Sequence, residues 1–178
     1  KGFSFRLDAP IDMRLNPRVG QSAADFLETA SRESLVRAVR EYGEERRWSR
    51  VVNAIVDARG TGKLQRTLSA AELVTQAVGG VRARQRIHPA TKTFQGVRIA
   101  INGELEALAM TLPKVFRALK PGGMLAVISF HSLEDRIVKR FMRKMSGRPQ
   151  HRGDRSFVAE RTAYAEMVQS KAIFPRKD

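Results

Sequence analysis

Cysteine is absent from this sequence of 178 residues, and histidine occurs only three times. The lack of cysteine excludes disulfides and cysteine–zinc sites, and it fits a cytoplasm and an organelle equally well. Three scattered histidines form no metal-ligand cluster, so no metal ion is expected. No apolar run approaches the roughly eighteen residues of a transmembrane helix, so we expect no membrane span.

Several motifs of common enzyme classes are also missing. The sequence has no Walker loop and no Gly-x-Gly-x-x-Gly motif after a strand. Ser129 and Ser132 lack the glycines of a nucleophile elbow, which excludes a serine hydrolase triad of that kind. The first residues resemble neither a signal peptide nor an obvious transit peptide. Because the sequence lacks an initiator Met, we expect the true N-terminus to lie upstream.

Acidic residues are heavily outnumbered by basic ones. The 33 Lys and Arg against 18 Asp and Glu give a formal net charge of +15 and a pI of about 11.2. Most of the excess lies in two stretches: 82–98, with five basic residues and no acid, and 136–155, with eight basic residues and one acid. This clustering predicts a polyanionic partner, with nucleic acid the first candidate and an anionic membrane surface the alternative. A solvated basic tail remains the other interpretation of the second stretch.

Helical periodicity dominates residues 22–80. The pattern predicts a first helix after the cap Ser22 with Asp25, and a second after Ser31 that ends near Gly43. A third is expected over about 44–58, and a fourth from Ser69, with a capping box, to the glycines at 79–80. These residues therefore predict a small all-helical unit.

The periodicity changes further along the chain. A long helical stripe begins near Thr93, and Pro113 should kink or restart it. A nearly continuous apolar run over 124–130 predicts a strand buried on both faces, and a helix is expected over about 132–145. A single buried parallel strand needs neighbours, so the chain is expected to be a piece of a larger α/β domain with the helical unit inserted.

The stretch 128–136 carries the most chemistry. It places Ser129, His131, Ser132 and Arg136 where open α/β sheets bind ligands, at a strand end and a helix start. Ordinary capping of the helix by Ser132 explains the same pattern equally well. A lone histidine at a strand end is more often structural than catalytic, so His131 carries both interpretations.

Two other segments are candidates. Asp8, Asp12 and Arg14 in a proline-containing loop could form a substrate clamp, or a structural Asp–Arg pair that holds an irregular loop. The segment 87–95, with His88 and Lys92, leads into the long helix and could contact RNA or form a basic turn.

Blocks of the sequence resemble the RsmH/MraW family in order and over roughly residues 1–145. The blocks are Gly2-Phe-Ser-Phe, Asp8-x-Pro-x-Asp-Met-Arg14, Tyr42-Gly-Glu-Glu-Arg46, His88-Pro-Ala-Thr-Lys-Thr-Phe-Gln95, Arg98-Ile-Ala-Ile-Asn102-x-Glu-Leu105, Leu119-Lys-Pro-Gly-Gly123 and Ile128-Ser-Phe-His-Ser-Leu-Glu-Asp-Arg-Ile-Val-Lys139.

This resemblance implies S-adenosylmethionine-dependent methylation of the exocyclic amine of a cytidine in small-subunit ribosomal RNA. It implies a fragment of an α/β class I methyltransferase (Rossmann-like) fold with an inserted all-helical substrate-recognition domain. The implied division is a core segment with a cleft loop over 1–20, the helical insertion over 21–92, a helix–strand–helix core over 93–145 and a basic tail over 146–178.

The resemblance also implies the site. Catalytic roles fall to Asp12, Arg14, Ser129 and His131. The substrate-binding set either lines the implied cleft or carries the basic charge: Met13, Arg82, Arg84, Arg86, His88, Lys92, Phe130, Ser132, Arg136, Lys139, Arg140 and Arg143. The family's S-adenosylmethionine residues precede the Gly-Phe-Ser-Phe block, so the cofactor-binding residues are expected upstream of residue 1. Ala9 and Leu15 stand where the family usually has Gly and Met.

The implied partner is small-subunit rRNA or the small ribosomal subunit. A non-catalytic rRNA-binding relative that serves ribosome assembly is the alternative function. The setting is a bacterial cytoplasm, with a mitochondrial matrix as the alternative. The oligomeric state stays open, with a homodimer one option.

Overall fold

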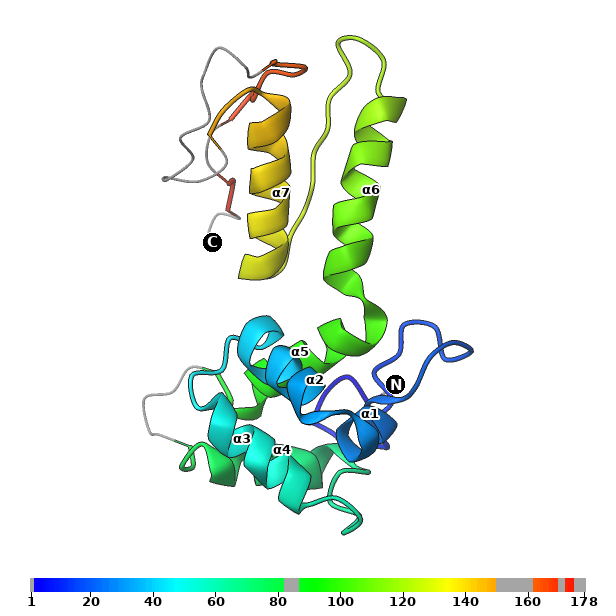
Figure 1. Ribbon diagram of the computed structural model, residues 1–178, viewed down its shortest axis with the longest axis vertical. Helices are drawn as coiled ribbons and strands as arrows, with labels where there is room; N and C mark the ends of the chain where they lie inside the picture. Colours follow the sequence, from blue (N-terminus) through cyan, green and yellow to red (C-terminus); the bar gives the residue numbers. More distant parts are fainter. Residues whose placement is uncertain (1, 82–86, 150–161, 170–171, 175–178) are drawn as a thin grey trace. The chain divides into compact units, whose positions relative to one another are not determined.

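The computed structural model describes residues 2–81, 87–149, 162–169 and 172–174. Within these ranges the regular structure is helical, without a β-strand beyond two isolated bridges. The chain divides into two units, Lys1–Glu104 and Leu105–Asp178. None of the helices in the described ranges combines the length and apolar character needed to cross a bilayer. Figure 1 shows the helices in sequence colours.

Unit 1 is helical over the predicted range 22–80 and also includes residues on both sides of it, up to Glu104. Its elements are α1 (Ala23–Thr29), α2 (Arg32–Val36), the π-helical turn η1 (Arg37–Tyr42), α3 (Trp48–Asp57), α4 (Thr67–Ala77) and α5 (Ala90–Asn102). The predicted cap of α1 is confirmed, because Ser22 and Asp25 form a reciprocal capping box. Ser31 caps α2 as expected.

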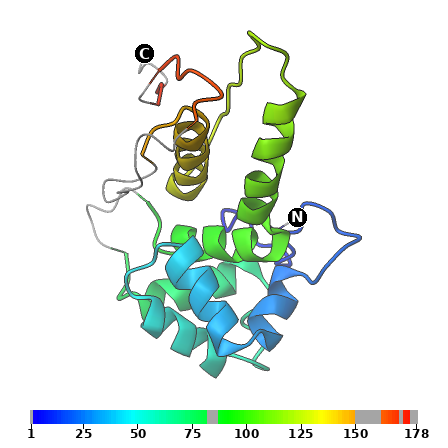
Figure 2. The same cartoon turned by 45° about the horizontal axis from the view of Figure 1, so that its top comes forward.

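Helix α5 is central to unit 1, where it contacts η1, α1 and α4 (Figures 1 and 2). Its contact with η1 is very close, because a Cβ atom on Gly96 would overlap the carbonyl oxygen of Ala38. Gly43 is similarly tight against the Lys92 carbonyl oxygen. The two glycines therefore let the backbones of η1 and α5 meet without side chains between them.

Two helix starts differ from the predictions. Helix α3 begins at Trp48 instead of about residue 44, because Glu44 has a left-handed φ of 49° that a helix cannot contain. Helix α4 begins at Thr67 instead of after Ser69. Its cap comes from Asp8, whose carboxylate accepts the Leu68 N–H at 3.3 Å. The Ser69 hydroxyl instead donates to the Lys63 carbonyl oxygen at 2.8 Å.

The predicted long helix is two helices. Gly103, with φ of 59°, ends α5, and α6 (Glu104–Ala118) then continues through Pro113. The break therefore lies at the glycine and not at the proline. A left-handed glycine is a common helix terminator.

Unit 2 contains the rest of α6, the segment 119–131 and α7 (Ser132–Met145). Phe116 of α6 meets Phe141 of α7 edge-on, with ring centroids 5.9 Å apart. Residues 124–129 are extended, but among the described residues they pair with no strand. Ile128 is 84% exposed, so the burial predicted for this run is not found in this chain. The physical reason is that the described residues supply no neighbouring strand to cover it.

Candidate functional site

The loop that contains Asp12 and Arg14 is anchored to two helices of unit 1. The Ile11 N–H donates to the Gln65 carbonyl oxygen at 3.1 Å, just before α4. The Asp12 and Ile11 carbonyl oxygens accept the first two N–H groups of α1, from Ala23 at 2.7 Å and Ala24 at 2.9 Å. The loop therefore satisfies backbone groups that a helix start leaves open.

Asp12 and Arg14 form a two-pronged ion pair. Arg14 Nε lies 2.6 Å from Asp12 Oδ1, and a terminal guanidinium nitrogen lies 3.1 Å from Oδ2. The guanidinium also donates to the Gly20 carbonyl oxygen at 3.1 Å. The Arg14 hydrogen bonds lower the pKa of the Asp12 carboxyl, and the carboxylate raises the pKa of Arg14. The Asp–Arg pair of the structural interpretation is thus present, with about a quarter of each side chain exposed, and the substrate clamp stays a prediction.

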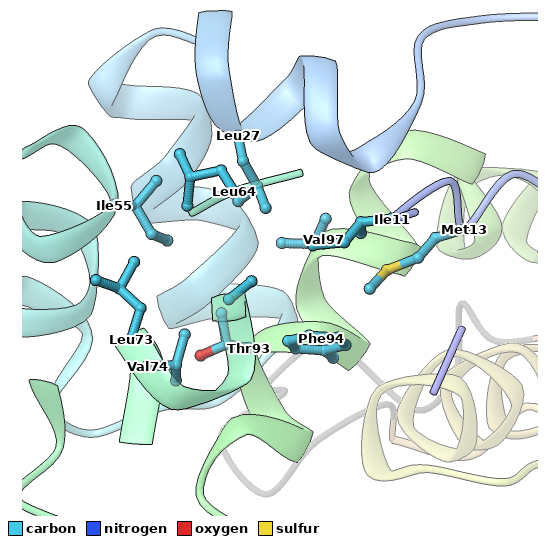
Figure 3. Close-up of a pocket in the computed structure, with 11 residues that line it drawn as sticks. Ile11, Met13, Leu27, Ile55, Leu64, Leu73, Val74, Thr93, Phe94 and Val97 are labelled. Atoms are coloured by element: carbon cyan, nitrogen blue, oxygen red, sulfur yellow. The ribbon is translucent and has the colours of Figure 1, made fainter. Parts of the chain in front are cut away.

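Met13, between these two charged residues, is buried in the core and only 1% exposed. It lines an enclosed apolar cavity of about 10 Å³, with Phe94 and Val97 from α5 (Figure 3). This volume holds about one water molecule. The substrate-binding role implied for Met13 stays a prediction, and its observed contacts are those of a core residue.

Asn102, the last residue of α5, holds the same loop and was given no role from the sequence. Its side-chain amide donates to the Met13 carbonyl oxygen at 2.8 Å, and its Oδ1 accepts the Leu15 N–H at 2.8 Å. The sequence shows that Asn102 precedes a glycine that can end a helix. It does not show that the partners of Asn102 are Leu15 and Met13, which lie 87 and 89 residues away.

The second group of predicted residues begins α7 in unit 2. His131 is the N-cap, because its Nδ1 accepts the Glu134 N–H at 3.4 Å, so the capping role expected of Ser132 belongs to its neighbour. Glu134 also accepts the Phe130 N–H at 2.8 Å. Ser129 is half-buried, Ser132 is exposed and the Phe130 ring is 90% exposed. The other ring nitrogen of His131, Nε2, is buried and lies 3.5 Å from Glu134 Oε1. His131 is thus a helix cap, and the catalytic role implied for it stays a prediction.

Helix α7 separates charge from apolar surface. Its basic residues recur at offsets of three and four along one face: Arg136, Lys139, Arg140, Arg143 and Lys144. Lys139 is paired with Asp135 at 2.6 Å, while Arg140 and Lys144 are exposed. The apolar residues Ile137, Val138, Phe141, Met142 and Met145 occupy the other side, while Leu133 in the first turn is buried. From Arg136 to Lys144 the predicted basic stretch is therefore an ordered helical face.

The structure describes only part of the first basic stretch, residues 82–98. Arg82, Arg84 and Arg86 lie outside the described residues. His88 stacks on Phe5, with ring centroids 4.5 Å apart, and its Nδ1 accepts the Ala90 N–H at 3.2 Å. Lys92 Nζ donates to the Glu44 carbonyl oxygen at 3.0 Å. Both side chains therefore make intramolecular contacts, and their roles in RNA binding stay predictions.

Three similar proteins from different bacteria carry the same name. "Ribosomal RNA small subunit methyltransferase H" from Cereibacter sphaeroides is 48% identical over 165 residues, covering 93% of this chain and 49% of the relative. The protein of the same name from Nitrosococcus oceani is 52% identical over 144 residues, covering 81% of this chain and 45% of the relative. That from Syntrophotalea carbinolica is 51% identical over 143 residues, covering 80% and 46%.

The chain thus spans about half the length of the curated relatives it matches. The family profile described as "MraW methylase family" matches residues 1–178. The Asp-Met-Arg loop and the helix capped by His131 lie where the resemblance places them in the sequence. The chain belongs to the MraW methylase family.

Proposed function

We propose that this chain is part of an S-adenosylmethionine-dependent methyltransferase that methylates the exocyclic amine of a cytidine in small-subunit rRNA. The observation that carries the proposal is the family match over residues 1–178, together with relatives named as small-subunit rRNA methyltransferases. The net charge of +15 and the basic face of α7 agree with an RNA substrate.

The Asp12–Arg14 pair fits a role in orienting the amine. An exocyclic amine conjugated to a pyrimidine is a poor nucleophile, so an enzyme gains most by fixing its direction of approach. The partly exposed Asp12 carboxylate can accept one amine N–H. Because Arg14 lowers the pKa of Asp12, the carboxylate is a weak base. Asp12 is therefore assigned to orientation, and not to removal of the proton before methyl transfer.

S-adenosylmethionine would supply the methyl group, but the described residues do not by themselves form its site. The enclosed cavity of unit 1 is apolar and about 10 Å³ in volume, far too small for an adenosyl group. The open hollow along residues 2–9 is lined without a carboxylate that could bind ribose hydroxyls. No catalytic step is therefore derived through the cofactor.

The class I fold and the domain division of 1–20, 21–92, 93–145 and 146–178 belong to the same proposal. The extended segment 124–129 supports it, because Met124 and Ile128 are 75% and 84% exposed and need a cover. A sheet completed by sequence outside this chain would provide one. A pocket formed around Phe130 by such a cover would accept a cytidine removed from its stack, with Ser129 and Ser132 near the base edge.

The direct test uses the full-length protein. Small ribosomal subunits from cells that lack this activity would be incubated with the protein and S-adenosylmethionine, and their nucleosides analysed by mass spectrometry. We expect one new methyl group on the exocyclic nitrogen of cytidine. A methyl group on another base, or on cytosine carbon, would refute the proposed chemistry.

A non-catalytic rRNA-binding relative that acts in ribosome assembly is the second candidate, and the basic face of α7 favours it equally. Calorimetric titration of the full-length protein with S-adenosylmethionine separates the two. Saturable binding supports the enzyme, and no heat at millimolar cofactor supports the binding protein. The bacterial relatives support a bacterial cytoplasm, and a mitochondrial matrix stays the alternative. A homodimer stays a prediction.

A further inference from the structure

The loop between Asp12 and Leu15 has an unusual backbone. Met13 has φ of 56°, one of two non-glycine residues with a left-handed φ among the described residues. A bulky side chain rarely adopts this conformation, which persists only where the surrounding structure imposes it. The conformation falls between the two residues of the ion pair. The strain therefore lies at the place where the proposed function needs accurate geometry.

Asn102 supplies the constraint from the end of α5. Its Nδ2 donates to the Met13 carbonyl oxygen and to the Arg98 carbonyl oxygen, each at 2.8 Å. Its Oδ1 accepts the Leu15 N–H at 2.8 Å. One amide thus bonds the residues on both sides of Arg14 and is itself tied to its own helix.

The end of α5 is in turn stiffened. Arg98 forms a two-pronged ion pair with Glu104, at 2.8 and 2.9 Å, across the left-handed Gly103. Gly103 stops the helix, so the Asn102 side chain lies at its terminus and can reach the loop. The helix end and the loop therefore behave as one hydrogen-bonded assembly.

We propose that Asn102 is a positioning residue, which holds the strained Met13 backbone so that Asp12 and Arg14 present a fixed ion pair to the target base. This inference rests on the proposed function for the identity of the substrate. Asn102 acts through the loop and is not assigned a contact with the base.

Only an amide fits all three bonds. Alanine removes every one of them. Aspartate keeps the acceptor for Leu15 but turns a second oxygen toward the Met13 and Arg98 carbonyl oxygens, which repel it. Asn102→Asp is therefore expected to be no better than Asn102→Ala, although it is almost the same size as asparagine.

The test uses the full-length protein with Asn102→Ala and Asn102→Asp. Asn53→Asp is the matched control, because Asn53 is an exposed asparagine on α3 that accepts from Arg32. The methylation rate is divided by the concentration of S-adenosylmethionine-binding sites, which calorimetry measures. Unfolded protein therefore does not contribute to the calculated kcat. We expect kcat to fall at least tenfold in both Asn102 variants, with the KM for ribosomal subunits within threefold of wild type. Phosphate contacts elsewhere supply most of the RNA affinity, which is why KM should hold.

A second readout does not depend on activity. Hydrogen exchange of the Leu15 amide should accelerate at least tenfold in both Asn102 variants and stay unchanged in Asn53→Asp. Unchanged exchange, or faster exchange with unchanged kcat, would overturn the inference. If the wild-type protein methylates no RNA, the proposed function fails, while the exchange rates still report whether Asn102 holds the loop.

Discussion

Two buried threonines in unit 1 differ in the hydrogen bonds of their hydroxyl groups. Thr67 is fully buried, and its hydroxyl donates to the Leu7 carbonyl oxygen at 2.8 Å and accepts the Ala9 N–H at 3.0 Å. Thr93 is 2% exposed, and its hydroxyl has no hydrogen-bond partner among the described residues. The same functional group is thus satisfied at one position and unsatisfied at the other.

Valine at each position should separate the two cases. Thr93→Val removes an unsatisfied hydroxyl, so we expect the free energy of unfolding to stay constant or rise by up to about 1 kcal/mol. Thr67→Val leaves the Ala9 N–H without its acceptor and should lower this free energy by about 1–3 kcal/mol. Urea denaturation of both variants measures the difference. Equal destabilisation by the two substitutions would contradict the assignment.

Residues of the site differ in how far the sequence predicts them. Two acids and an arginine in one loop suggested a substrate clamp or a structural Asp–Arg pair, and the structure shows that Asp12 is the partner of Arg14. The cap by His131 was one residue away from the expected cap at Ser132, which lies within the usual uncertainty of helix ends. The role of Asn102 was not predictable, because it depends on which loop the fold brings to the end of α5.

At the scale of elements, the start of α4 is determined by a distant carboxylate. Asp8 accepts the Leu68 N–H and pairs with Arg66 at 2.5 Å. The Arg66 hydrogen bond holds the pKa of Asp8 below the ordinary value of 3.8. A lowered folded-state pKa stabilises the fold above about pH 3.8, and this contribution is lost as the pH falls through the folded-state value.

Asp8→Asn should therefore lower the Tm at neutral pH, and the gap to wild type should close as the pH falls below 3.8 and through the lowered folded-state pKa. Asp57→Asn is the control, because Asp57 is exposed at the C-terminal end of α3, where a negative charge is unfavourable. That variant should keep or raise the Tm. Thermal melts at several pH values provide the comparison. A gap for Asp8→Asn that persists at low pH would rule out the charge as its cause.

The basic face of α7 makes a separate prediction about RNA. The double reversal Arg140→Glu with Lys144→Glu should raise the Kd for small-subunit rRNA more than tenfold at fixed salt. The slope of log K against log salt should also fall in magnitude, by roughly 1.5 if two phosphate contacts are lost. Filter binding at several salt concentrations measures both quantities.

The matched control is Lys114→Glu with Lys120→Glu, which changes the net charge by the same amount. Lys114 on α6 and Lys120 in the following turn are exposed and lie outside the α7 face. Similar losses for both pairs would mean that the total charge matters and that the α7 face has no special role.

Elements were predicted best where their signals are local. Ser22 and Ser31 cap their helices with groups three residues away, and the glycines after α4 end it where expected. The start of α4 was wrong because its cap comes from Asp8, 60 residues earlier. The predicted break at Pro113 is wrong, because α6 continues through this proline and the left-handed backbone of Gly103 ends α5.

At the scale of the whole molecule, the two units differ in their cores. Among the residues that the structure describes, nearly all of the buried apolar side chains belong to unit 1, while unit 2 contributes Leu112 and Leu133. We expect a polypeptide of residues 1–104 to unfold cooperatively on its own, and one of residues 105–178 to lack a cooperative transition. Circular dichroism melts and amide NMR spectra of the two polypeptides test this. A cooperative transition for residues 105–178 would contradict it.

The sequence by itself determined the family, the helical character of residues 22–80 and the two basic stretches, because these depend on local periodicity, composition and motif order. Only the tertiary structure decided that Asp8 caps α4, that Asn102 holds the Asp12–Arg14 loop and that the 124–130 segment is uncovered in this chain. Each of these depends on partners brought together, or left missing, over long sequence separations. Local patterns carry no information about such partners, because hydrogen bonds and burial are set by distance in space.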